Sequence, residues 1–239
     1  MNAPHSEFLC HARGNCPRLC SGQSAPAALA RELERGDLLF RSGDNAGALF
    51  VVRSGAVKTC RLGEDGSEQI LGFYLPGEIV GFDAITQGRY VADAMALKAT
   101  QLCRIACQPA ASASGDGSLL PERLMTGFGQ EVQRLQNLLV LERCSAEQRL
   151  ARFLLQMADK QARLGRSSRY VSLPMARGDI GRFLHLATET VSRMFTRLAG
   201  LGWIRIEGSG VEILDAAALA GSRPQPALRR DRPALPQAA

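Results

Sequence analysis

Three cysteines lie within eleven residues near the amino end of the chain, at positions 10, 16 and 20. Clustered cysteines form disulfides in small secreted domains, whereas in cytosolic proteins they bind metals or undergo redox chemistry. The first twenty residues contain two arginines and lack the apolar segment of a secretory signal. We therefore expect a cytoplasmic protein with reduced thiols, in which the cysteines bind metal or sense redox state. No apolar run is long enough to span a membrane, so we do not expect a membrane as a partner.

Positive charge is concentrated in the second half of the chain. Residues 1–142 contain 13 Lys+Arg and 15 Asp+Glu, whereas residues 143–215 contain 12 and 7, a net charge of +5. A basic region of this kind indicates a polyanionic partner, with nucleic acid first, although a solvated basic surface is the alternative.

Residues 36–120 have the pattern of a sensor domain built from β-strands. Short β-rich runs alternate with turn signals such as GEDG at 63–66 and the glycines of LPGEIVGF. This spacing predicts a small antiparallel β-roll or sandwich over residues 36–108. The cysteine-rich residues 1–35 precede it as a separate ligand segment.

Residues 121–143 predict one long helix, with Pro121 at its start. Its apolar residues step by three and four, which is the a/d seam of a coiled coil. Gly127 and Gly129 lower helix propensity in the first turns. The seam predicts a parallel homodimer, and packing on the chain's own β domain is the alternative. The seam residues are Met125, Phe128, Val132, Leu135 and Leu139.

Residues 144–215 predict a winged helix-turn-helix domain. A helix begins near Ser145 as N-cap, and residues 175–214 then show two short amphipathic helices with Thr188 as the second N-cap. A wing hairpin turns at 208–210. A structural helical hairpin with a charged face is the alternative. The tail, residues 216–239, is expected to be disordered because it is rich in proline and poor in apolar residues.

The second short helix exposes side chains that suit DNA. Arg193 can bond guanine, Glu189 can accept from cytosine, and Ser192 can bond a base or a phosphate. Arg182 and Arg197 suit phosphates, which give affinity without sequence preference. The predicted DNA-contacting residues are Glu189, Thr190, Ser192, Arg193, Arg197 and Arg182.

Residues 36–215 carry a resemblance to a known family. GDIGRFLHLATETVSRMFTRL contains an E-x-x-S-R recognition signature, SGAVKTCRLGEDGSEQILGFYLPGEIVGFDAI is similar to a family β-roll, and SAEQRLARFL is similar to the segment after the dimer helix. The chain resembles the CRP/FNR superfamily of transcription regulators, in its FNR-type branch. The resemblance implies an α+β fold with an N-terminal cyclic-nucleotide-binding-like antiparallel β-roll, a long dimerisation helix and a C-terminal winged helix-turn-helix. It also implies a palindromic DNA site with TTGAT half-sites, and RNA polymerase as a partner.

The resemblance further implies a [4Fe–4S] cluster that senses oxygen and controls dimerisation and DNA binding. Cys103 stands where the family has its fourth ligand, so Cys10, Cys16 and Cys20 would supply the other three. Their spacing here is C-x5-C-x3-C, whereas the family commonly has C-x2-C-x5-C. A thiol switch, zinc, haem or nitric oxide are the alternative signals. The other three cysteines, Cys60, Cys107 and Cys144, are expected to be structural.

Two further functions are not expected from the sequence. The cyclic-AMP branch holds its nucleotide with Gly-Glu followed by Arg-Ser, whereas GFDAITQGRYVADA has Asp83 near the glutamate position and only Arg89 as a phosphate partner. We therefore expect no cyclic nucleotide. The chain also has no nucleophile–base pairing, phosphate loop or carboxylate dyad with motif support, so we expect no enzyme.

Overall fold

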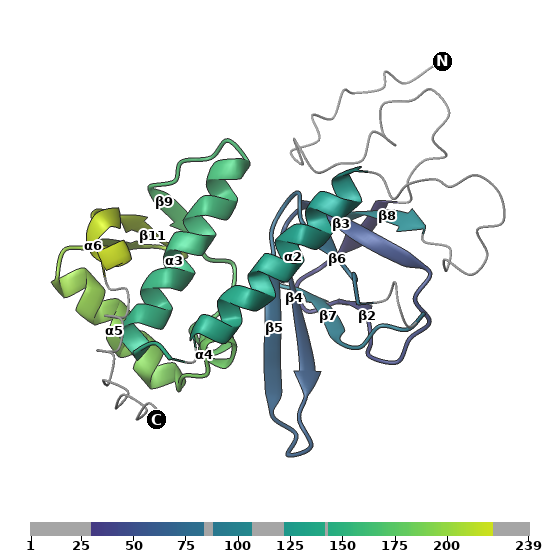
Figure 1. Cartoon of the computed structure of the whole chain (residues 1–239), viewed down its shortest axis with the longest axis horizontal. Helices are drawn as coiled ribbons and strands as arrows, with labels where there is room; N and C mark the ends of the chain where they lie inside the picture. Colours follow the sequence, from purple (N-terminus) through teal and green to yellow (C-terminus); the bar gives the residue numbers. More distant parts are fainter. Residues whose placement is uncertain (1–29, 84–87, 107–121, 142, 222–239) are drawn as a thin grey trace, which may run out of the picture.

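The computed structural model describes residues 30–83, 88–106, 122–141 and 143–221. A β-roll and a mainly helical domain lie on either side of one long helix, α2 (Figure 1). The expected α+β fold, with a roll followed by helices and a C-terminal winged helix-turn-helix, is confirmed. No helix among the described residues is long and apolar enough to cross a membrane.

The β-roll consists of two four-stranded sheets with antiparallel pairing throughout. One sheet has the order β1-β8-β3-β6 and the other β2-β7-β4-β5. A core that includes Phe50, Val52 and Leu102 lies between them. The strands are β1 (Ala30–Leu33), β2 (Leu38–Phe40), β3 (Ala48–Ser54), β4 (Val57–Leu62), β5 (Glu68–Tyr74), β6 (Ile79–Val80), β7 (Asp93–Ala96) and β8 (Thr100–Ala106).

The roll begins earlier than the sequence predicted. The expected ligand segment, residues 1–35, contains β1, which pairs with β8 along its whole length. Its sequence, AREL, has a weak strand signal because only Leu33 is a large apolar residue. Pairing with β8 and burial of Leu33 in the roll core determine the strand.

Helix α2 (Glu122–Leu141) turns one face to the roll and another away from it. Gly127 lies against β6, and a Cβ there would come within 2.9 Å of Ile79 Cδ1 and 3.0 Å of Phe82 Cζ. The guanidinium of Arg134 is buried and donates to the Leu71 carbonyl. The five predicted seam residues are exposed, from 38% for Val132 to 70% for Leu139. The roll therefore leaves much of the seam uncovered, although the Phe128 ring meets Phe82 of the roll edge to face.

Helix α3 (Ala146–Arg163) begins as predicted. Ser145 is its N-cap, and Ser145 and Gln148 form a reciprocal capping box. The helix buries Leu150, Phe153 and Leu154 in the largest hydrophobic cluster. That cluster also includes roll residues such as Phe73, so the two halves of the molecule share one core.

The helix-turn-helix consists of α4 (Arg177–Leu184) and α5 (Thr188–Gly200). The N-cap of α5 is Ala187, without a side-chain cap bond, so the assignment of Thr188 as N-cap was wrong by one residue. The wing is a three-stranded sheet of order β10-β11-β9. Its strands are β9 (Tyr170–Ser172), β10 (Ile204–Glu207) and β11 (Gly210–Ile213).

The predicted disordered tail also needs correction at its start. Ala216–Gly221 form a further helix, α6, which packs on α3. Asp215 Oδ1 accepts a hydrogen bond from the Ala218 amide at 2.8 Å, and Leu219 is buried. A capping carboxylate, alanine-rich helix propensity and one apolar anchor explain the helix. The rest of the tail lies outside the described residues.

Candidate nucleic-acid interface and cysteine site

The turn between α4 and α5 is tight. His185 ends α4 in the left-handed region, at φ 55°, and the Leu186 amide bonds the Gly181 carbonyl at 2.9 Å. A Cβ on Gly181 would come within 2.6 Å of the Leu186 oxygen, so glycine is required there. Val191, Phe195 and Leu198 form the buried face of α5. The two helices therefore form one packed unit.

The outer face of α5 presents the predicted reading residues together. Glu189, Ser192 and Arg193 are exposed, and Thr190 is half-buried. The Ser192 hydroxyl donates to the Thr188 carbonyl at 3.0 Å, which orients its oxygen along the helix. Within the described part of the chain, neither Glu189 nor Arg193 forms a salt bridge. A guanidinium and a carboxylate one helical turn apart can bond base edges in a major groove.

The two predicted phosphate ligands are held by carboxylates of the same chain. Arg197 Nε lies 2.6 Å from Glu147 Oε2 at the start of α3. Arg182 Nη1 lies 3.1 Å from Asp179 Oδ1 and 3.3 Å from Glu68 Oε2 on the roll. Arg197 shares α5 with the reading residues, whereas Arg182 lies at the contact between the two domains.

Sequence reasoning named no basic residue on the wing sheet. Arg169, before β9, and Arg205, on β10, both pair with Glu212 of β11, at 2.7 and 2.5 Å. Both arginines are mostly exposed, at 66% and 60% of their side chains. The signal available in the sequence was the alternation of charge along WIRIEGSGVEIL, which places Arg205 and Glu212 opposite each other.

Cys103 is the predicted ligand that the structure describes. It lies on β8, 6% exposed, on the face of its sheet that is turned away from the roll core. Leu49, Val51 and Ile79 pack around it. In the sheet register, Ala30 of β1 stands directly opposite Cys103. Cys10, Cys16 and Cys20 lie outside the described residues.

The other described cysteines are in keeping with a structural role. Burial raises the pKa of the Cys60 thiol to about 12, so it is protonated at neutral pH. Cys144 is buried between α2 and α3, and its thiol donates to the Val140 carbonyl at 3.4 Å. Cys107 lies outside the described residues.

Two family models match the chain over the regions just described. The cyclic nucleotide-binding domain matches residues 30–109, and the Crp-like helix-turn-helix domain matches residues 148–221. The first match begins at β1, and the second covers α3 from its third residue, the helix-turn-helix, the wing and α6.

Named relatives specify the branch. The chain is 40% identical over 197 residues to the transcriptional activator protein anr of Pseudomonas aeruginosa, covering 81% of each chain. It is 36% identical to the fumarate and nitrate reduction regulatory protein of Escherichia coli, covering 80% of this chain and 76% of that one. The chain belongs to the CRP/FNR family, in its FNR-type branch. This FNR-type protein is therefore a DNA-binding transcription regulator and not an enzyme.

Solved structures of the CRP/FNR family share the fold. FixK2 from Bradyrhizobium japonicum superposes with a TM-score of 0.74 at 26% identity, covering 83% of this chain and 98% of that one. TTHB099 of Thermus thermophilus, at 23% identity and a TM-score of 0.63, supports the fold alone. In this FNR-type chain, the two residues nearest to the nucleotide-binding positions of the cyclic-AMP branch both form hydrogen bonds with the backbone of their own domain. Asp83 accepts from the Val91 amide, and Arg89 donates to the Gly43 carbonyl, each at 2.9 Å.

Proposed function

We propose that this FNR-type regulator senses oxygen or redox state through a [4Fe–4S] cluster held by Cys10, Cys16, Cys20 and Cys103. The cluster controls dimerisation and, through it, DNA binding. Four thiolates are the usual ligand set for such a cluster. When bound, it would supply a redox-active centre that ties the amino-terminal segment to the roll.

The observation that carries this proposal is the pairing of β1 with β8. Because Ala30 stands opposite Cys103, the segment that bears the other three thiols is anchored beside it. Cys20 precedes Ala30 by ten residues, so extended chain of at most about 35 Å separates it from that anchor. The apolar surroundings of Cys103 also limit access of water, which suits a ligand of an oxygen-labile centre.

The cysteine site is also adjacent to the dimerisation helix. Ile79 belongs to the cluster around Cys103, and Phe82 packs against that cluster. The Phe82 ring meets the ring of Phe128, a seam residue, edge to face at 6.1 Å between centroids. Gly127 allows the close approach of α2 to Ile79. A change around Cys103 therefore reaches the seam through two packed side chains.

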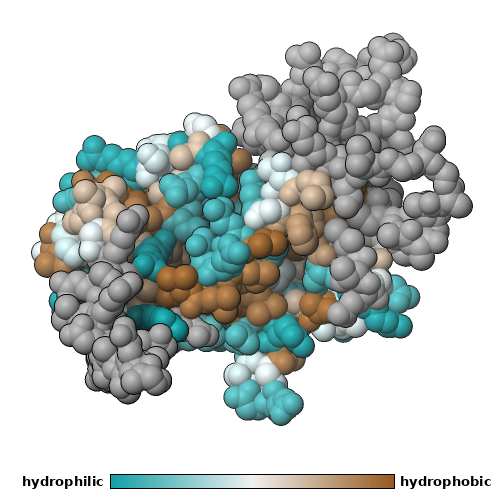
Figure 2. Space-filling model, viewed as in Figure 1, coloured by the Kyte–Doolittle hydropathy of each residue, from teal (hydrophilic) through white to brown (hydrophobic). Residues whose placement is uncertain are grey.

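The exposed seam supports a parallel homodimer in which α2 pairs with its copy. Hydrophobic surface covers the middle of the molecule where α2 crosses it (Figure 2). A two-fold dimer presents two copies of α5, which suits a palindromic FNR-type site with half-sites about one helical turn apart. Glu189, Thr190, Ser192 and Arg193 would read bases, and Arg182 and Arg197 would contact phosphates. RNA polymerase is the expected protein partner.

A second candidate keeps the regulator and changes its signal. The spacing C-x5-C-x3-C departs from the pattern common in the family, and the same four thiols could bind zinc or form a disulfide switch. A haem or nitric-oxide signal would not require Cys103. Each of these signals gives a different analytical result from a cluster.

Anaerobic purification followed by iron, sulfide and zinc analysis tests the proposal. We expect a brown dimer with four irons and four sulfides per chain, the content of the proposed cluster. The Cys103→Ser variant should lose iron and sulfide. Cys60→Ser is the matched control, because Cys60 is also a buried roll cysteine but is not a proposed ligand.

Three results would contradict the cluster. A colourless, iron-free wild-type protein that binds its DNA site equally with and without air would remove the sensor. Zinc without sulfide, lost in Cys103→Ser, would replace the cluster with a zinc site. Iron with a haem spectrum that survives Cys103→Ser would indicate the haem alternative.

A further inference from the structure

A buried lysine joins the β-roll to the helix-turn-helix. Lys58 of β4 is 7% exposed, and its Nζ lies 2.8 Å from Glu68 Oε1 on the neighbouring strand. The same Nζ donates to Asp179 Oδ1 at 3.1 Å. Asp179 lies in the first turn of α4, 121 residues further along the chain. One ammonium group therefore bonds both domains.

Arg182 completes a four-residue ionic network with Lys58, Glu68 and Asp179. Its Nη1 contacts Asp179 Oδ1 at 3.1 Å and Glu68 Oε2 at 3.3 Å. Two cations thus face two carboxylates, whose side chains are 24% and 13% exposed. A buried ammonium is tolerated only when it is paired, so Lys58 favours the arrangement in which α4 lies against the hairpin of β4 and β5.

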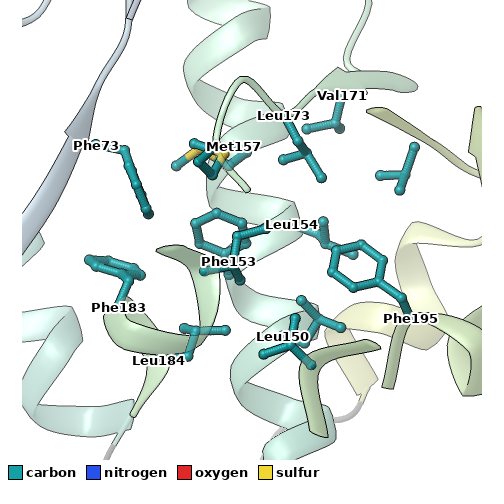
Figure 3. Close-up of a cluster of buried hydrophobic side chains, with 14 of the residues drawn as sticks. Phe73, Leu150, Phe153, Leu154, Met157, Val171, Leu173, Phe183, Leu184 and Phe195 are labelled. Atoms are coloured by element: carbon teal, nitrogen blue, oxygen red, sulfur yellow. The ribbon is translucent and has the colours of Figure 1, made fainter. Parts of the chain in front are cut away.

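Aromatic packing also joins the β4–β5 hairpin to helices α4 and α3. Phe73 of β5 meets Phe183 of α4 and Phe153 of α3, with centroids 5.2 and 6.0 Å apart (Figure 3). Lys160 of α3 donates to the Phe73 carbonyl at 2.8 Å. Apolar packing supplies contact area, whereas the directional bonds of Lys58 set the position of α4 on the hairpin.

The position of α4 determines the position of α5. Three residues, 185–187, connect the two helices, and Gly181 allows their backbones to touch. The Leu186 amide bonds the Gly181 carbonyl, and the buried face of α5 packs in the same core as α4. Because α4 and α5 move as one unit, a bond that fixes α4 on the roll also fixes the reading face of α5.

We infer that Lys58, through Asp179, is a positioning residue for DNA recognition. It fixes each recognition helix relative to its own roll and thereby sets the separation and angle of the two recognition helices in the dimer. The inference rests on the dimer of the proposed function. On this inference, the β4–β5 hairpin determines which spacing between half-sites the protein accepts.

The test measures half-site spacing preference. Wild-type protein, prepared without air, first selects its site from random duplexes, and duplexes with one base pair more or fewer between the half-sites are then compared. Each base pair shifts a half-site by about 3.4 Å and rotates it around the axis. We expect wild type to prefer one spacing. Lys58→Met and Asp179→Asn should reduce that preference about tenfold, as expected for a coupled pair, while Lys58→Arg retains it.

Two further variants keep the test decisive. Asp65→Asn is the matched control, because Asp65 lies on the same hairpin and bonds only locally to Ser67. If Lys58→Met fails to fold because Asp179 loses one of its two cationic partners, the double variant Lys58→Met/Asp179→Asn removes both charges, and it should fold and tolerate altered spacing. Circular dichroism and thermal unfolding confirm folding in each case.

The outcomes separate the inference from the function on which it rests. Equal loss of affinity at every spacing, with the wild-type preference unchanged in the folded variants, would overturn the inference alone and leave Lys58 as a stabilising residue. A wild-type protein that binds as a monomer, without any preference in spacing, would overturn the dimer and the inference together. Relaxed spacing in the Lys58 and Asp179 variants, but not in Asp65→Asn, supports it.

Discussion

Arg193 and Arg197 lie one turn apart on α5, yet their surroundings differ. Arg193 is exposed and forms no salt bridge among the described residues, whereas Arg197 pairs with Glu147 at 2.6 Å. A guanidinium without an internal partner can bond a base bidentately. One that is already held by a carboxylate is better suited to a charge interaction with a phosphate. The two arginines should therefore contribute differently to affinity and to specificity.

Alanine substitution tests that difference. Arg193→Ala should cost about 1–3 kcal/mol on the selected site and relax preference at one base pair. Arg197→Ala should weaken binding to all duplexes alike and lower the salt slope by about one. Fluorescence anisotropy on specific and random duplexes at several salt concentrations measures both. An equal effect of Arg193→Ala on specific and random DNA would show that it contacts phosphate.

At this scale, the sequence predicted what depends on local spacing. The buried positions Val191, Phe195 and Leu198 follow from helical periodicity, and the outward residues follow by exclusion. The partners of the charged residues did not follow. Lys58 meets Asp179 across 121 residues, and only the packed domains bring such groups together.

At the scale of elements, α2 was the most predictable helix, and its exposed apolar seam still lacks a partner. Its bounds differ by only one and two residues from the predicted 121–143. The prediction was close because the apolar seam repeats over several turns. Strand β1 and helix α6 were missed because each is short and depends on one buried leucine, Leu33 or Leu219. Tertiary packing, rather than local pattern, determines such elements.

The apolar seam of α2 predicts that a charged residue placed in it will weaken the dimer. Leu135 is 49% exposed in the single chain, and in a parallel coiled coil it would meet its own copy. Leu135→Glu would place two carboxylates in that interface, and an unpaired buried charge costs about 3–5 kcal/mol, so the dimer should weaken by about a hundredfold or more. Analytical ultracentrifugation of the anaerobic protein measures this change.

The control for this prediction lies on the same helix. Gln133 is exposed on α2 but is not a seam residue, so Gln133→Glu adds the same charge without entering the interface. It should leave the dimer intact. A Leu135→Glu protein that dimerises as tightly as wild type would place the interface elsewhere.

At the scale of the whole molecule, the two sheets of the roll carry different contacts. The sheet that bears Cys103 meets α2 through Ile79, next to Phe82. The sheet that bears Lys58 and Phe73 meets α4 and α3 (Figures 1 and 3). The roll is thus placed to influence both the pairing of two chains and the orientation of each reading helix.

The ionic contact between the domains predicts a pH dependence of stability. Burial alone would raise the pKa of Glu68, but bonds from Lys58 and Cys60 outweigh it and hold that pKa below the usual 4.5. Burial likewise opposes the charge of Lys58, but Glu68 and Asp179 raise its pKa above the usual 10.5. Arg182 also lowers the pKa of Glu68, while Cys60 interacts with Glu68 and Lys58 and is itself influenced by Asp93.

The sign of each contribution follows from linkage. The stability that Glu68 provides is complete above pH 4.5 and is lost as the pH falls through its lowered native pKa. The stability that Lys58 provides is complete below pH 10.5 and is lost as the pH rises through its raised native pKa.

Between these limits, Glu68→Gln should lower the melting temperature by a constant amount, and below pH 4.5 the difference from wild type should shrink. Thermal unfolding from pH 3 to 8 measures it, with Glu32→Gln, an exposed carboxylate bonded to Gln101, as control. A difference between Glu68→Gln and wild type that stays the same down to pH 3 would show that Glu68 does not stabilise the contact through its charge.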